Sequence, residues 1–171
     1  MQNIIETERL LLRPLGMQDA DFIIELLNDP SFIKNIGDRN VHSVEDAHGY
    51  ILKGPVTSYE KNGFGLCLVT LKETGESIGM CGLIKRDALE DVDLGYAYLP
   101  RYWSKGYAVE AAKATLNFGW EVIGLKRIVA ITDPANTPSN RVLEKLGFVF
   151  EKMDKIAADD IDLNLYAIHK P

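Results

Sequence analysis

The sequence predicts one α/β domain, residues 1–171, built on a mixed sheet. Three observations indicate this class. Runs of β-favouring residues alternate with segments whose apolar residues recur at helical spacing. The length of 171 residues is typical of one globular domain. No repeat, low-complexity tract or linker divides the chain.

The first third of the chain is expected to contribute one strand and two helices. Residues 4–14 favour a strand that ends at its proline. A helix is predicted from Asp19 to the residue before Asp29-Pro30. A second helix is expected to begin at Ser43, where Asp46 has the spacing of a capping box. Glycines and a proline further along leave the end of that helix undefined.

The middle of the chain favours a hairpin followed by a third strand. Residues 64–72 and 77–86 are rich in β-favouring side chains, and the turn-like Glu73–Glu76 separates them. Residues 92–99 form the next predicted strand, which ends before a proline. The first two of these segments are expected to pair as the hairpin.

The last third alternates between helix and strand. A long helix is predicted over 105–123 and a buried strand over 127–132. A short helix follows and closes at Gly147. Two final strands, at about 148–155 and 160–169, complete the domain. The expected total is about seven strands and about four helices.

Composition excludes several classes of protein. Acidic residues outnumber basic ones 25 to 19, for a net charge of −6, and no basic run suits a nucleic-acid backbone. No apolar run approaches membrane length and no leader pattern is visible, so we expect a cytoplasmic protein without a membrane partner. Cys67 and Cys81 lie in apolar stretches as expected for reduced thiols, and His42, His48 and His169 lack metal-ligand spacing.

One segment has the pattern of an anion site. A strand ends near Leu99, a short loop carries Lys105 and Gly106, and the long helix begins at once. Free N–H groups and the positive end of a helix dipole then point at one spot, and glycine permits close approach to the backbone. The glycine spacings of nucleoside triphosphate loops and dinucleotide folds are absent. A glycine that only starts a helix is the alternative.

A second turn from strand to helix carries Asn136 and Ser139. Two parallel turns of this kind can hold the two ends of one elongated ligand. Thr137 suits the N-cap of the short helix and Pro138 its first residue. Capping alone also explains Asn136, so the segment favours a ligand only together with the first turn.

The chain resembles the GNAT superfamily of acyl-coenzyme-A-dependent N-acetyltransferases, in particular the branch of ribosomal-protein N-terminal alanine and serine acetyltransferases. The motifs are in family order across nearly the whole chain. They are Glu8-Arg9-Leu10-Leu11-Leu12-Arg13-Pro14, Asp93-Leu94-Gly95-Tyr96, Trp103-Ser104-Lys105-Gly106-Tyr107-Ala108 with Glu110-Ala111, Asn136 with Ser139, and Lys145 with Gly147-Phe148.

The resemblance implies acetyl-CoA as co-substrate, a mostly antiparallel sheet splayed at the cofactor site, and no metal. It implies that one loop holds the coenzyme A pyrophosphate, namely Trp103, Ser104, Lys105, Gly106, Tyr107, Ala108 and Val109. Main-chain groups of Ala97, Tyr98 and Leu99 match the strand edge that pairs with the pantetheine arm. Asn136 and Ser139 match the positions nearest the thioester.

Two residues depart from the family pattern. Ser104 replaces a glycine found in many members and is expected to hold the loop to negative φ. Leu143 stands where many members have the tyrosine that acts as general acid. The resemblance therefore makes Ser139 the candidate proton donor to the leaving thiolate, and a serine that only bonds a local backbone group is the alternative.

The chemistry requires a neutral amine, a polarised carbonyl and a route for one proton. An N-terminal α-amine, with a reference pKa of about 7.7–8.0, needs only a weak base. Asp93 is the candidate base or amine anchor, with a solvated acid at the strand end as the alternative. A backbone N–H near Tyr98 or Leu99 is the expected donor to the thioester oxygen. Direct attack of the amine is the expected route.

Three functions remain open on the sequence: an enzyme, a cofactor-binding module, and a structural or interaction domain that binds no coenzyme A. The first is an N-acetyltransferase acting on an amine, either a protein N-terminus or a small molecule. The second is a non-catalytic acyl-CoA-binding or sensor module, which Leu143 motivates. The acidic clusters Asp87–Asp93 and Asp159–Asp162 are candidates to attract a cationic amine. The sequence is compatible with either a monomer or a homodimer.

Overall fold

A computed structural model describes residues 4–156 and 161–171. An open sheet of eight strands crosses the molecule in the order β1-β2-β3-β4-β5-β6-β8-β7. Every neighbouring pair is antiparallel except β5 and β6, which are parallel. The strands are β1 Ile5–Glu6, β2 Leu10–Pro14, β3 Leu66–Leu71, β4 Ser77–Ile84, β5 Asp93–Tyr98, β6 Arg127–Thr132, β7 Val149–Lys155 and β8 Asp162–His169. The predicted α/β class and mostly antiparallel sheet are confirmed.

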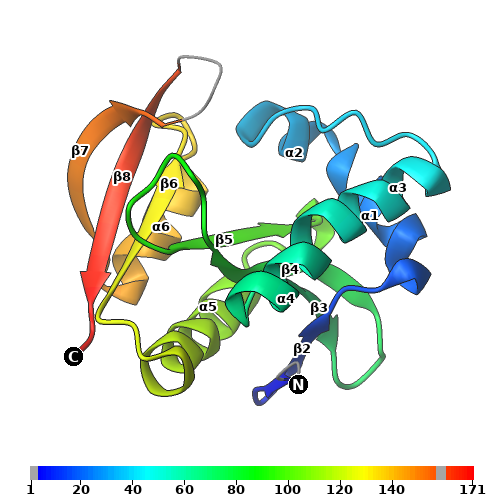
Figure 1. The fold of residues 1–171 in the computed structure, drawn as a ribbon, viewed down its shortest axis with the longest axis horizontal. Helices are drawn as coiled ribbons and strands as arrows, with labels where there is room; N and C mark the ends of the chain where they lie inside the picture. Colours follow the sequence, from blue (N-terminus) through cyan, green and yellow to red (C-terminus); the bar gives the residue numbers. More distant parts are fainter. Residues whose placement is uncertain (1–3, 157–160) are drawn as a thin grey trace.

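Helices cover both faces of this sheet (Figure 1). They are α1 Ala20–Leu27, α2 Pro30–Asn35, α3 Val44–Ile51, α4 Thr57–Asn62, α5 Tyr107–Phe118 and α6 Thr137–Leu146. Helices α1 to α4 lie on one face, and α5 and α6 lie on the other. Short 3-10 turns at Met17–Asp19 and Pro100–Tyr102 and π-helical turns at Leu52–Val56 and Gly119–Ile123 extend or join them.

The predicted strand over 4–14 is two strands, so the sheet has eight rather than seven. The N–H of Thr7 donates to the carbonyl of Leu10 at 2.9 Å, and the hydroxyl of Thr7 accepts from the N–H of Leu10 at 3.0 Å. This tight turn folds β1 back onto β2, with Ile5 opposite Leu12. The turn falls on the polar residues between Ile5 and Leu10, which contain neither glycine nor proline to mark a break.

The region after Asp29 contains more helix than the sequence indicated. Asp29 accepts from the N–H of Ser31 at 2.9 Å and begins α2, because a proline at the first helical position needs no N–H partner. The expected cap at Ser43 is confirmed, since its hydroxyl accepts from the N–H of Asp46 at 3.0 Å. The carboxylate of Asp46 in turn accepts from the N–H of His42 at 3.0 Å. The π-helical turn Leu52–Val56 accommodates Pro55 between α3 and α4.

Two apolar cores fix the sheet between the helical layers. The core against α5 and α6 includes Leu83, Ala111, Leu116, Ile128 and Leu143, each at most 5% exposed. The core against α1 to α4 includes Ile23, Leu26, Ile51, Leu68 and Leu99, each at most 1% exposed. Burial of such side chains contributes about 1.5–3 kcal/mol each. Within residues 4–156 and 161–171, no helix is long and apolar enough to span a membrane.

Candidate functional site

The strands β5 and β6 pair at one end only. Asp93 is opposite Val129, and the N–H of Val129 donates to the carbonyl of Val92 at 3.0 Å. Beyond this point β6 pairs with β8 and β5 pairs with β4. The two strands therefore diverge, as the family resemblance implied, and the facing edge of β5 is open.

A cleft of about 840 Å³ lies at this divergence, bounded by β5, the Trp103–Val109 loop, α6 and the α2 region. Ten of the twelve expected cofactor-binding residues line it: Ala97, Tyr98, Trp103, Ser104, Gly106, Tyr107, Ala108, Val109, Asn136 and Ser139. Leu99 and Lys105 do not line it. Leu99 is 1% exposed within the core on the α1–α4 side, and the side chain of Lys105 is exposed outside the cleft.

The hydrogen bonds of β5 decide which of its amides face the opening. The N–H of Leu99 donates to the carbonyl of Ile78 at 3.0 Å, so it points toward β4. Because successive backbone groups of a strand alternate in direction, Ala97 also faces β4, whereas Tyr98 faces the open edge. The indole N–H of Trp103 donates to the Tyr98 carbonyl at 2.9 Å. Of the two candidate donors to the thioester oxygen, Tyr98 has an N–H on the open side.

The loop before α5 adopts a left-handed backbone at two positions. Gly106, the N-cap of α5, has φ +82°. Ser104 has φ +61°, so the expectation that this serine holds the loop to negative φ is wrong. Left-handed backbone costs a non-glycine residue about 1–3 kcal/mol and persists only where the surroundings impose it. The loop therefore keeps the conformation of a glycine loop although it contains a serine.

The turn between β1 and β2 holds this loop in place. The guanidinium of Arg9 donates to the carbonyl of Lys105 at 2.9 Å and to the carboxylate of Glu110 at 2.7 Å. Glu110 also accepts from the hydroxyl of Thr7 at 2.7 Å, and Arg9 stacks 4.5 Å above the ring of Tyr107. These contacts tie the first strand pair to both sides of the loop.

Helix α6 begins one residue earlier than predicted. Its N-cap is Asn136, whose side-chain oxygen accepts from the N–H of Ser139 at 3.3 Å, so Thr137 is the first helical residue rather than the cap. Asparagine suits this position because its side chain satisfies an amide that the helix cannot. The cap orients the first turn of α6 and places Ser139 on the wall of the cleft.

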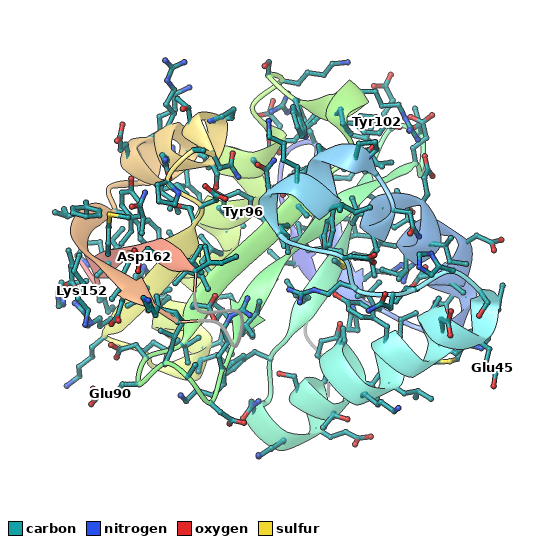
Figure 2. All side chains as sticks on the ribbon, turned by 90° about the horizontal axis from the view of Figure 1, so that it is seen from above. Glu45, Glu90, Tyr96, Tyr102, Lys152 and Asp162 are labelled. Atoms are coloured by element: carbon teal, nitrogen blue, oxygen red, sulfur yellow. The ribbon has the colours of Figure 1, made fainter. Side chains whose placement is uncertain are left out.

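The hydroxyl of Ser139 lies 2.9 Å from that of Tyr96, and the Tyr96 hydroxyl also donates to the Ser139 carbonyl at 3.2 Å. Figure 2 shows Tyr96 between α6 and α2. Burial raises the pKa of Tyr96, so this phenol stays protonated at neutral pH. The sequence indicated Ser139 but not its partner. Leu143, where the family often has its tyrosine, is fully buried one turn further along α6.

Asp93 is buried rather than solvated, which excludes the alternative of an exposed acid at the strand end. Its side chain is 1% exposed and accepts from Nε of Arg86 at 3.1 and 3.2 Å. Burial raises the pKa of Asp93 to about 6, although Arg86 opposes the shift. Asp93 and Tyr96 are three residues apart on a strand, so their side chains point to opposite faces of the sheet at the cleft.

The acidic loop before β5 does not form a wall of the cleft. Asp91 accepts from Arg127 at 3.0 Å, and Figure 2 shows Glu90 at the periphery of the molecule, pointing outward. Of the residues from Asp87 to Asp93, only Asp93 lines the cleft. In the second acidic cluster, Asp159 and Asp160 lie outside the described residues. The described part of the chain therefore does not support attraction of a cation by these two clusters.

The thiols are poor candidates for covalent chemistry. Cys67 and Cys81 are free and face each other across β3 and β4. Burial raises the pKa of Cys67 to about 12 and that of Cys81 to about 11, so neither forms a thiolate at neutral pH. His48 lies 3.1 Å from the carbonyl of Met17, away from the cleft. Among residues 4–156 and 161–171, no group of three or more His, Cys, Asp or Glu side chains is arranged to hold a metal.

Comparison with known proteins agrees with this geometry. Residues 9–149 match the family described as Acetyltransferase (GNAT) domain. The N-acetyltransferase YoaA of Bacillus subtilis (strain 168) is 31% identical over 174 residues, which cover 98% of this chain and 97% of that protein. A GNAT-family acetyltransferase from Bacillus anthracis superposes with a TM-score of 0.81 at 31% identity, covering 98% of both chains.

A second similar structure is that of a ribosomal L7/L12 α-N-protein acetyltransferase in complex with coenzyme A. It superposes with a TM-score of 0.84 at 19% identity and covers 98% of each chain. At this identity the likeness concerns the fold.

The burial of Asp93 leads to a titration prediction. In ¹³C NMR spectra, the Asp93 carboxyl should titrate near pH 6. Arg86 lowers this pKa, so Arg86→Met should move the midpoint to higher pH, whereas Lys61→Met on α4 should leave it unchanged. A midpoint near 4 in both the original protein and the Arg86 variant would contradict the buried environment.

Proposed function

The chain belongs to the GNAT acetyltransferases, and on that premise we propose that it transfers the acetyl group of acetyl-CoA to a primary amine by direct attack. One observation carries the proposal. A buried carboxylate with a raised pKa and a protonated pair of hydroxyls lie on opposite faces of β5 where β5 and β6 diverge. The acceptor is either a protein N-terminal α-amine or a small-molecule amine.

The residues around the cleft fit acetyl-CoA. When bound, acetyl-CoA supplies a thioester whose acyl carbon accepts the amine. The left-handed turn at Ser104 and Gly106 and the start of α5 leave main-chain amides free for a pyrophosphate. The open edge of β5 leaves main-chain groups that an extended arm can reach. These features support the assignment of the Trp103–Val109 loop to the phosphates.

Asp93 is the proposed base or amine anchor. A carboxylate whose pKa is about 6 holds a proton more readily than an ordinary aspartate and is still mostly ionised at neutral pH. Its side chain belongs to the α1–α4 face of the sheet, and Arg86 is hydrogen-bonded to it there. In this scheme the amine enters on that face and loses its proton to Asp93, directly or through a water.

Tyr96 and Ser139 are the proposed route for the returning proton. If the Tyr96 hydroxyl donates to Ser139 Oγ, the serine proton is free for the leaving sulfur. If Ser139 donates instead, the serine proton moves to the tyrosine oxygen as the phenol proton moves to the leaving sulfur. Both arrangements are compatible with the 2.9 Å separation. We therefore propose the pair, rather than Ser139 alone, as general acid.

The Tyr98 N–H is the proposed donor to the thioester oxygen. It belongs to a strand whose other edge is fixed by β4 throughout Asp93–Tyr98. A donor held in place before the reaction needs no reorganisation when charge develops on the oxygen, which makes such a donor effective. The contact from Trp103 to the Tyr98 carbonyl further restricts this peptide.

The alternative of a non-catalytic acyl-CoA-binding module rested on Leu143. Its motivation weakens because Tyr96 brings a phenol to the start of α6 from a different element. The site therefore contains an acidic hydroxyl although α6 lacks the tyrosine found in many family members.

The direct test is turnover. We expect acetyl-CoA, incubated with N-terminal peptides, amino acids, aminoglycosides and polyamines, to release free coenzyme A with at least one class, measured with a thiol reagent, and mass spectrometry to find the acetylated amine. Tight binding of coenzyme A without turnover on any amine would favour the binding module instead.

Removing the phenol should impair the chemical step. Tyr96→Phe should lower kcat about 100-fold, the low end for acid–base assistance, with little change in KM for acetyl-CoA. Because the two hydroxyls act as a unit, adding Ser139→Ala should cost little more. Tyr166→Phe is the matched control, since Tyr166 packs against Phe150 outside the cleft. Additive losses in the double variant would contradict a shared role.

A further inference from the structure

The charge of the cleft is opposite to that of the chain. The sequence has a net charge of −6, but basic side chains predominate among the residues that line the cleft. The bases are Lys34, Arg39, Arg86, Arg141 and Lys145, and the acids are Asp93 and Asp133. A cationic acceptor such as a polyamine would meet like charge there.

The arginines outside the cleft are all paired with carboxylates, whereas two of the three arginines that line it are not. The four arginines that do not line the cleft all pair with carboxylates: Arg9, Arg13, Arg101 and Arg127. In the described part of the chain, Arg39 and Arg141 have no hydrogen bond or ion pair. Arg86 uses only Nε, on Asp93, and its two terminal nitrogens have no partner among the described residues.

Arg39 and Arg86 converge near one end of the cleft. Arg86 is fixed there by its bond to Asp93 at the start of β5, with 37% of its side chain exposed. Arg39 follows α2 and lines the same cleft, as does Tyr50 of α3. Both arginines lower the pKa of Tyr50 against the effect of burial, as expected if both guanidinium groups lie near its hydroxyl.

Arg141 and Lys145 belong to a different part of the cleft. They lie on α6, which starts beside Tyr96 and packs with α5 on the other face of the sheet. That position suits the phosphates of the acetyl donor. The basic side chains left for the acceptor side are therefore Lys34, Arg39 and Arg86.

We propose that the acceptor carries an oxyanion, a carboxylate or a phosphate, next to the amine that is acetylated. This inference rests on the proposed function. Asp93 engages the amine, and the terminal nitrogens of Arg86, with Arg39 and the Tyr50 hydroxyl, bind the oxyanion. A guanidinium presents a planar pair of donors that matches either group. Because Arg86 touches Asp93, amine and oxyanion are bound within a few atoms of each other, the spacing found in amino acids and phosphorylated amino alcohols.

Matched acceptor pairs test the proposal. Leucine is compared with leucinamide, because Phe32, Ile33 and Ile36 give this end an apolar lining, and phosphoethanolamine is compared with ethanolamine. The anionic member of at least one pair should have a kcat/KM about tenfold or more above its neutral partner, the effect of one charge-assisted hydrogen bond. The pair that responds distinguishes carboxylate from phosphate. Leucinamide has the more acidic amine, so amine ionisation alone would favour the opposite order.

Variants then locate the effect. Arg39→Gln should raise KM for the anionic acceptor about tenfold, leave kcat and the neutral acceptor unchanged, and be partly rescued by Arg39→Lys. Lys61→Gln, an exposed charge loss on α4 outside the cleft, is the control. Arg39 has no hydrogen-bond or ion-pair partner among the described residues, so its loss should not affect folding, and a thermal melt verifies this.

Two results separate failure of this inference from failure of the proposed function. A kcat/KM for leucinamide, ethanolamine or spermidine that equals or exceeds the values for leucine and phosphoethanolamine would overturn the oxyanion site. Acetyl transfer itself would remain intact. Absence of turnover with every amine, despite binding of coenzyme A, would overturn both. An Arg39→Gln effect that is equal on both members of the acceptor pair that responds would also contradict the proposal.

Discussion

The site depends on the divergence of two parallel strands. β5 and β6 share one pair, at Asp93 and Val129, and each strand then keeps only its other neighbour. The opening is inexpensive because both strands stay hydrogen-bonded on one side and both faces are packed by helices. A strand edge in a protein interior must have its groups satisfied, so this edge favours a ligand that can pair with it.

The functional groups are distributed around that opening by strand geometry. Alternation along β5 sends Asp93 to one face and Tyr96 to the other, while the Tyr98 amide points between them. The loop beyond β5 is strained at Ser104. Arg9, in the turn between β1 and β2, holds the loop in place through its contacts with Lys105 and Glu110. Backbone strain that contacts from other segments maintain in a binding loop is typical of a preorganised site.

The sequence predicted what is encoded locally. The turn at Gly106, the cap near Asn136 and most strands depend on short-range patterns. The partner of Ser139 was missed because Tyr96 is 43 residues away and only the packing of α6 on β5 joins them. The ion pairs of Asp93 with Arg86 and of Asp91 with Arg127 likewise follow from the folded chain and not from a local pattern. Ser104 was misjudged because its tertiary surroundings override its local backbone preference.

Hydrogen exchange at one amide tests the central claim most directly. By ¹⁵N NMR, the Tyr98 N–H should exchange rapidly in the free protein and become protected when acetyl-CoA binds. The Leu99 N–H, bonded to Ile78, should be protected in both states and serves as the internal control. A Tyr98 amide that is already protected without ligand, or that stays unprotected with saturating acetyl-CoA, would contradict the assignment of the open edge of β5 as the binding edge.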